Sequence, residues 1–227
     1  MMRQAKPLTA TRMAARTAII LFLFVVIFTA LLASAYLWTL PTIQAAAVEE
    51  KMKLIGEVLP GSHYDNDLLN NTVRIAATDS LGLDEDSIAY RASKNGKPSA
   101  VVLEAVAPDG YAGKIRLMIA VGADGAVIGV RVTQHKETPG LGDYIEPKKD
   151  KNKDRPWIAQ FDGLTPTAID APQWKVKKDG GRFDSMAGAT VTPRAVIKAV
   201  RKAALYVAAN HERFFASRQN VADEVRK

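Results

Sequence analysis

Residues 184–193, with the sequence DSMAGATVTP, combine hydroxyl groups and small side chains in a way that could hold a phosphate. The residues that carry this pattern are Ser185, Gly188, Ala189, Thr190 and Thr192. Pro193 and the apolar positions after it predict a helix that begins at Thr192, with Thr192 as its N-cap. The unpaired N–H groups and positive dipole end of a helix start favour an anion, and small residues allow its close approach. A threonine oxygen here could form a phosphate ester.

A second polar segment, HKETPGLGDYIE at residues 135–146, contains two side chains that could exchange protons. His135 and Glu137 stand two residues apart, so they could act as a general acid and base. No nucleophile or metal-ligand spacing accompanies them, and a structural role is the simpler interpretation. Gly140 and Gly142 bracket a tight loop, which a turn after a strand would explain.

Together the two segments resemble the motifs of the FMN-binding domain family. In that family, an Asp, spacer residues and Ser/Thr-Gly-Ala-Thr mark a threonine that receives FMN from FAD through a flavin transferase. A His-x-Glu-Thr-Pro-Gly-Leu-Gly loop packs against the flavin. Asp184, Gly188, Ala189 and Thr190 match the first motif, and residues 135–142 match the second. The resemblance implies covalent FMN, joined through its phosphate to Thr190.

The resemblance also implies which other residues contact the cofactor. They are Asp184, Ser185, Gly188, Ala189, Thr192, His135, Glu137, Thr138, Gly140, Leu141, Gly142 and Lys177. Leu141 and the loop backbone would lie against the flat ring. Lys177 or Lys178, in the basic segment 174–180, would favour an anionic reduced flavin by its charge, although solvated lysines are the simpler interpretation. From the residues alone, a capped turn is the simpler interpretation of 184–193, and the resemblance is what favours the flavin site.

Composition excludes several other kinds of site. The chain contains no cysteine, which removes disulfides, thiolate nucleophiles and iron–sulfur clusters. Its three histidines, His63, His135 and His211, lack metal-ligand spacing, so we expect no metal site. Gly-x-Gly-x-x-Gly, P-loop and Gly-x-Ser-x-Gly motifs are also missing from the sequence.

The net charge of +7 does not indicate nucleic-acid binding. Arg3, Lys6, Arg12 and Arg16 precede a long apolar run, so only +3 remains for the rest of the chain. Acidic residues are mixed with that remainder, and no basic stripe is interleaved with aromatic residues. We therefore predict no nucleic acid among the partners.

Residues 18–40 form an uncharged apolar run that is long enough to span a membrane as a helix. Tyr36 and Trp38 would lie at the far interface. A cleaved signal peptide is the alternative, supported by the small residues 45–47, but its apolar region would be shorter. A retained anchor is the better interpretation.

The basic residues before the run predict the orientation of the chain. Basic residues stay in the cytoplasm, so residues 1–17 form a cytoplasmic tail and residues 18–40 the transmembrane helix. Residues 41–60 continue as a stalk or first helix, and residues 61–227 form an exported domain. The bacterial inner membrane, with the domain on its periplasmic side, is the expected location.

The fold class follows from the periodicity of the exported part. Residues 99–107, 114–121 and 126–132 are β-rich, and Asp124-Gly125 predicts a hairpin between the last two. Helical patterns flank these strands. We therefore predict an α+β fold, with a single transmembrane helix followed by a mostly antiparallel sheet flanked by helices.

Beyond the two motifs, the resemblance spans nearly the whole chain and extends to the G subunits of Rnf-type ion-translocating complexes. It implies an electron-transfer role between ferredoxin and NAD, with the other membrane subunits and a flavin transferase as partners. Such a subunit would catalyse no complete turnover alone. One alternative is the FMN subunit of a sodium-translocating NADH:quinone oxidoreductase. A membrane-tethered binding module with a non-covalent ligand is another.

Overall fold

The computed structural model describes residues 10–216, in two compact units that divide between Lys51 and Met52. Arg3 and Lys6, two of the four basic residues of the predicted cytoplasmic tail, lie outside the described residues. The elements in chain order are α1 (Ala10–Val58), β1 (Thr72–Ile75), β2 (Ser87–Lys94), β3 (Lys97–Gly110), β4 (Gly113–Gly122), β5 (Val127–Gln134), α2 (Val191–Ala209) and α3 (His211–Phe215). Short 3-10 helices, η1 to η5, occupy the connections.

In the first unit, helix α1 carries the predicted membrane span. Its apolar side chains between residues 18 and 40 are exposed along the chain, as a lipid environment requires. It is the one helix among the described residues that is long and apolar enough to cross a membrane. The Ser34 and Thr39 hydroxyls donate to the carbonyls of Ala30 and Ala35, so they present no free polar group. Pro41 lies inside this continuous helix.

A five-stranded antiparallel sheet forms the centre of the second unit, with the strands in sequential order. The predicted strands 99–107 and 114–121 lie within β3 and β4, and the third, 126–132, overlaps β5 from Val127 onward. Asp124 and Gly125 turn the chain between β4 and β5, where Gly125 has a φ of 80°. The predicted α+β class is thus confirmed, and β1 and β2 extend the sheet beyond the three strands expected.

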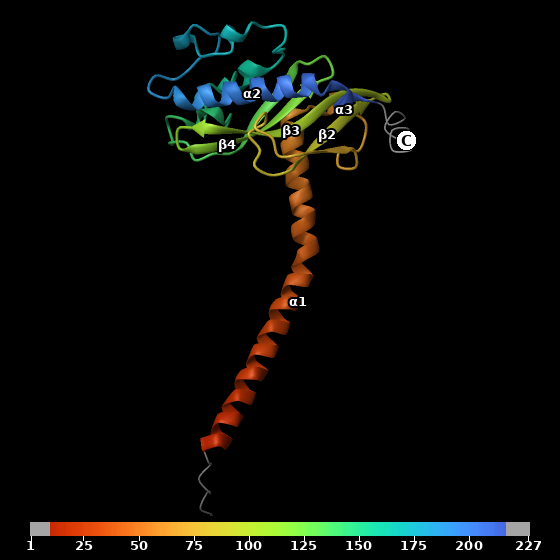
Figure 1. Cartoon of the computed structure of the whole chain (residues 1–227), viewed down its shortest axis with the longest axis vertical. Coiled ribbons are helices and arrows are strands. Elements are labelled where there is room, and N and C mark those ends of the chain that lie inside the picture. Colours follow the sequence, from red (N-terminus) through yellow and green to blue (C-terminus); the bar gives the residue numbers. More distant parts are fainter. Residues whose placement is uncertain (1–9, 217–227) are drawn as a thin grey trace, which may run out of the picture. The chain divides into compact units, whose positions relative to one another are not determined.

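Helices cover both faces of the sheet. On one face α2 packs mainly along β3 (Figure 1), and alternate residues of β3 such as Val101 and Leu103 belong to the same buried cluster as α2. The opposite face buries the last turn of α1, where Ile55 and Val58 pack with Val102. Alternation along the strands therefore supplies two apolar surfaces, one for each helix.

The long connection between β5 and α2 contains both predicted motifs. It includes η2 (Asp143–Ile145), η3 (Trp157–Phe161), η4 (Ala171–Gln173) and η5 (Lys177–Asp179). A buried aromatic cluster holds these segments together: Tyr144, Trp157, Phe161, Trp174 and Phe183. Because the rings come from every part of the connection, the segment has its own packed core.

Candidate functional site

Helix α2 begins at Val191, with Thr190 as its N-cap. The predicted N-cap at Thr192 is wrong by two residues, because the Thr192 hydroxyl donates to Glu137 and does not cap the helix. Thr190 is half-buried, and its side chain makes no cap hydrogen bond. Within the part of the chain that the structure describes, the Thr190 hydroxyl has no hydrogen-bond partner. It is therefore available for chemistry.

The loop before Thr190 is a closed turn. The Ala189 N–H donates to the Met186 carbonyl at 3.1 Å, and Gly188 has a φ of 83°. A side chain at Gly188 would meet no other atom within 4 Å, so its backbone angle, rather than crowding, explains the glycine. The turn thus presents an open surface next to Thr190.

Asp184 anchors the other end of this loop. Its carbonyl accepts a hydrogen bond from Trp157 Nε1 at 2.6 Å, and its N–H donates to Gln160 Oε1 at 2.9 Å. The Asp184 carboxylate forms an ion pair with Lys177 at 2.6 Å, so these two predicted site residues meet. Both partners of the pair are largely exposed, which makes its contribution to stability small.

The second motif forms a tight loop of its own. The Thr138 carbonyl accepts from the N–H groups of Leu141 and Gly142, at 3.1 and 3.0 Å. Gly140 has a φ of 77° and donates its N–H to Asp143 Oδ1 at 2.8 Å. Leu141 consequently stands at the tip of the loop with 47% of its surface exposed.

Two connections bring the motifs together across more than forty residues of sequence. The Thr192 hydroxyl donates to Glu137 Oε2, and both residues are buried. The Tyr144 hydroxyl donates to the Ala189 carbonyl and accepts from the Met186 N–H, at 3.4 Å in each case. The loop of residues 135–146 therefore supports the loop that carries Thr190.

His135 contacts Glu146 rather than facing Glu137 as an acid–base partner. Its Nδ1 accepts from the Glu137 N–H at 3.0 Å, so the proton lies on Nε2, which is 2.5 Å from Glu146 Oε1. The His135 side chain is only 6% exposed. Both ring nitrogens of His135 therefore have a hydrogen-bond partner, and the side chain orients the start of the loop of residues 135–146.

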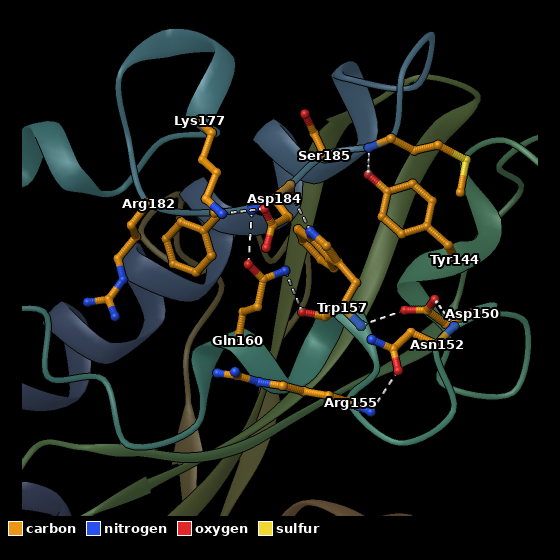
Figure 2. A pocket seen from close by; sticks show the side chains of 12 residues that line it. Tyr144, Asp150, Asn152, Arg155, Trp157, Gln160, Lys177, Arg182, Asp184 and Ser185 are labelled. Atoms are coloured by element: carbon orange, nitrogen blue, oxygen red, sulfur yellow. Dashed lines mark hydrogen bonds and ion pairs between the residues drawn. The ribbon is translucent and has the colours of Figure 1, made fainter.

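A cleft of ≈ 650 Å³ opens beside the Thr190 loop (Figure 2). It is lined by Tyr144, Asp150, Asn152, Arg155, Trp157, Gln160, Lys177, Arg182, Phe183, Asp184, Ser185 and Met186. The guanidinium groups of Arg155 and Arg182 extend toward the same end of the cleft and form no ion pair within residues 10–216. Its volume is within the range of cofactor sites.

Most of the cleft lies outside the predicted motifs. Lys177, Asp184 and Ser185 are predicted cofactor contacts, whereas Trp157 and Arg182 are not. In the sequence, Trp157 stands out only as the first apolar residue after the polar, lysine-rich segment 146–156. Burial raises the pKa of Tyr144, and the nearby Asp150 carboxylate raises it further, so its phenol stays protonated and can donate to Ala189. Across residues 10–216, no cluster of three or more acidic or histidine side chains could hold a metal.

A family match and two relatives agree on the kind of protein. The FMN-binding domain family matches residues 110–205. The G subunit of the ion-translocating oxidoreductase complex of Pseudomonas aeruginosa is 46% identical, covering 92% of this chain and 95% of that protein. The corresponding protein of Shewanella baltica is 41% identical over 87% of this chain and 91% of its own. The crystal structure of Shewanella oneidensis NqrC is 24% identical with a TM-score of 0.40, covering 62% of this chain and 65% of that one.

The fold and these matches define a membrane-anchored protein with an FMN-binding domain. More narrowly, the chain belongs to the family of G subunits of ion-translocating oxidoreductase complexes. The predicted resemblance to that family is confirmed.

Proposed function

We propose that this chain carries FMN as a phosphate ester of Thr190 and transfers electrons within a membrane-bound, Rnf-type ion-translocating oxidoreductase. The observation that carries the proposal is the Thr190 hydroxyl, which has no hydrogen-bond partner among the described residues. It lies at the start of α2, beside the exposed turn at Gly188. Family membership supports FMN as the cofactor and electron transfer as the role.

The three hydroxyl groups of the loop differ in their availability. Thr192 is 2% exposed and donates to Glu137, so its oxygen is not accessible. Ser185 is half-buried and lines the cleft, and it precedes the helix start in the sequence. Thr190 alone combines a free hydroxyl with the first turn of α2, whose amides and dipole suit a phosphate. The residues therefore fit a phosphate-linked flavin.

The attachment step balances with FAD as the donor. The Thr190 oxygen forms a bond to the phosphorus that carries the riboflavin, and the pyrophosphate bond to the adenylate breaks. The hydroxyl proton leaves with AMP, which is the second product. A flavin transferase would supply the catalysis, because the structure places no general base on the Thr190 hydroxyl.

Other residues would hold and tune the cofactor. We assign Leu141, exposed at the loop tip, to contact with the flavin ring. The positive side chains of Lys177, Arg155 and Arg182, which line the cleft, would attract the negative charge of the cofactor. Gly188 and Ala189 would allow the phosphate to approach the backbone. When bound, FMN supplies one- and two-electron chemistry, and the protein supplies binding, orientation and charge.

The proposal extends to the position and partners of the chain. Residues 1–17 would be cytoplasmic, and residues 61–227 would lie on the periplasmic side of the bacterial inner membrane. The partners would be the other Rnf membrane subunits, with electrons exchanged between ferredoxin and NAD. The uncharged span of α1 and the basic residues before it support this arrangement.

The test is to express the chain with a flavin transferase and examine it in a denaturing gel. We expect a fluorescent band, and an intact mass increased by one FMN less one water. Thr190→Ala should abolish both signals, because it removes the only free hydroxyl at the helix start. Thr167→Ala, at an exposed threonine outside both motifs, should change neither.

Two outcomes would contradict the proposal. Fluorescence that survives Thr190→Ala would place the ester on another residue. A wild-type chain that binds FMN but releases it on denaturation would support the non-covalent binding module instead.

A further inference from the structure

We infer that Glu137 determines which threonine is modified, by withholding the Thr192 hydroxyl and holding the first turn of α2 so that Thr190 alone is offered. The inference rests on the proposed ester at Thr190 and adds a positioning residue to it. Glu137 contacts Thr192 and not Thr190, so it acts through its neighbour.

Glu137 is a buried carboxylate with both oxygens engaged. It is 4% exposed, Oε2 accepts from the Thr192 hydroxyl, and Oε1 accepts from the Ala112 N–H at 3.0 Å. No cation pairs with it in the described part of the chain. Its stabilisation comes from these two hydrogen bonds and from the adjacent first turn of α2, whose dipole favours a negative charge.

Two glycines make room for this carboxylate. A Cβ at Gly142 would lie 3.0 Å from Glu137 Oε2 and 2.9 Å from Thr192 Oγ1. At Gly110, a Cβ would lie 2.9 Å from Glu137 Oε1. The β3–β4 turn, the tight loop and the start of α2 thus converge on one side chain. This convergence assigns Glu137 a positioning role rather than direct contact with the flavin.

The contact separates two threonines that are otherwise similar. Thr190 is the N-cap of α2 and Thr192 lies in its first turn, so both are where the helix dipole attracts a phosphate. Thr192 is turned inward and its hydroxyl is donated to a charged acceptor, whereas the Thr190 hydroxyl has no such partner. Without Glu137, no hydrogen bond holds the Thr192 hydroxyl inward, and the first turn of α2 loses its contact with the loop of residues 135–146.

The experiment compares Glu137→Leu, Glu137→Gln and wild type in the full chain, each co-expressed with the flavin transferase. Mass spectrometry of the peptide containing residues 183–194 measures the fraction of flavin on Thr190 and on Thr192. For Glu137→Leu we expect about a tenfold slower modification at Thr190 and new modification at Thr192, since a charged hydrogen bond is lost. For Glu137→Gln, one oxygen remains for Thr192, so Thr190 should stay the main site.

A control separates positioning from general loss of stability. Val200→Ala removes buried volume from the middle of α2 and should lower the unfolding temperature without redistributing the flavin. Rescue provides a second check, because Thr192→Ser keeps the hydroxyl and should behave as wild type, while Thr192→Val should slow modification of Thr190.

The outcomes are distinguishable from failure of the proposed function. Absence of flavin from both threonines in the wild type would contradict the proposed phosphate ester itself. Wild-type modification at Thr190 together with an unchanged rate and site in Glu137→Leu would overturn the role of Glu137 alone. A redistribution in Val200→Ala equal to that in Glu137→Leu would also overturn it.

Discussion

At the scale of single residues, Tyr144 forms the second connection between the motifs. Its ring packs edge-on against Trp157 at a centroid distance of 5.7 Å, and its hydroxyl contacts the backbone of Met186 and Ala189. A buried phenol therefore joins the aromatic cluster to the turn beside Thr190. The turn depends on this side chain because the Met186 N–H has no partner within its own loop.

Tyr144→Phe should destabilise the domain by about 1 kcal/mol, because it leaves a backbone N–H and a carbonyl without their partner while the ring packing is retained. Urea unfolding of the full chain in detergent measures this change. Tyr111→Phe is the matched control, since Tyr111 is 70% exposed and its hydroxyl makes no hydrogen bond within residues 10–216. Equal stability of Tyr144→Phe and wild type would show that the hydroxyl contacts are negligible.

At the scale of elements, the end of α1 lies directly against β5. A Cβ at Gly129 would stand 2.5 Å from the Val58 carbonyl and 3.1 Å from its Cα. The glycine therefore sets the distance at which the last turn of the helix can pack on the sheet. The apolar contacts of Ile55 and Val58 depend on that close approach.

Gly129→Ala should push the last turn of α1 away from the sheet and cost about 1–3 kcal/mol, as overpacking does in other cores. The measurement is the free energy of unfolding in urea, followed by tryptophan fluorescence. Gly61→Ala serves as a control, because an added Cβ there meets nothing within 4 Å. Full stability in Gly129→Ala would mean that the helix end can shift without penalty.

The sheet also shows where local patterns stop being informative. Strands β3 and β4 are apolar over most of their length, and the sequence predicts both. Strand β1 has only four residues, and in β2 Ile88 is exposed while Ala89 is buried, so hydrophobicity does not report the inward face. Strand β2 is determined by pairing with β3, and β1 by pairing with β2, which is information that their own sequences lack.

At the scale of the whole molecule, four carboxylates among residues 10–216 have lowered pKa values. They are Asp84, Asp86, Asp109 and Asp179. Hydrogen bonds from Lys114, Lys198 and Arg194 are the main causes for Asp84, Asp109 and Asp179, and the Ala77 N–H is the main cause for Asp86, followed by Arg74. The pairs join separate segments, such as α2 to β3 through Lys198 and Asp109.

These pKa shifts predict loss of stability in acid. A carboxylate whose folded pKa lies below its ordinary value of 3.8 stabilises the fold above that pH and loses this effect as the pH falls below it. The unfolding temperature should therefore be insensitive to these groups between pH 7 and 5 and decrease below pH 3.8. Calorimetry from pH 7 to pH 2 checks this, and an unfolding temperature that rises below pH 3.8 would contradict it.

Contacts between residues that are distant in the sequence limit how much of the site the sequence predicts. The two motifs and Thr190 stand out in the sequence because of their residue types and their resemblance to a family. The direction in which each hydroxyl points does not, and Thr192, the predicted helix cap, instead ties the helix to Glu137. Trp157 and Gln160 hold Asp184 from more than twenty residues away, and no spacing rule reports such contacts.

The enclosure of Glu137 by Gly110 and Gly142 has an evolutionary consequence. A lineage that gained a side chain at either glycine would have to shorten the acid, and one that lost the acid would leave a void that larger residues could fill. Substitutions at Glu137, Gly110, Gly142 and Thr192 should therefore occur together. Divergent relatives would retain all four residues or exchange them as a group.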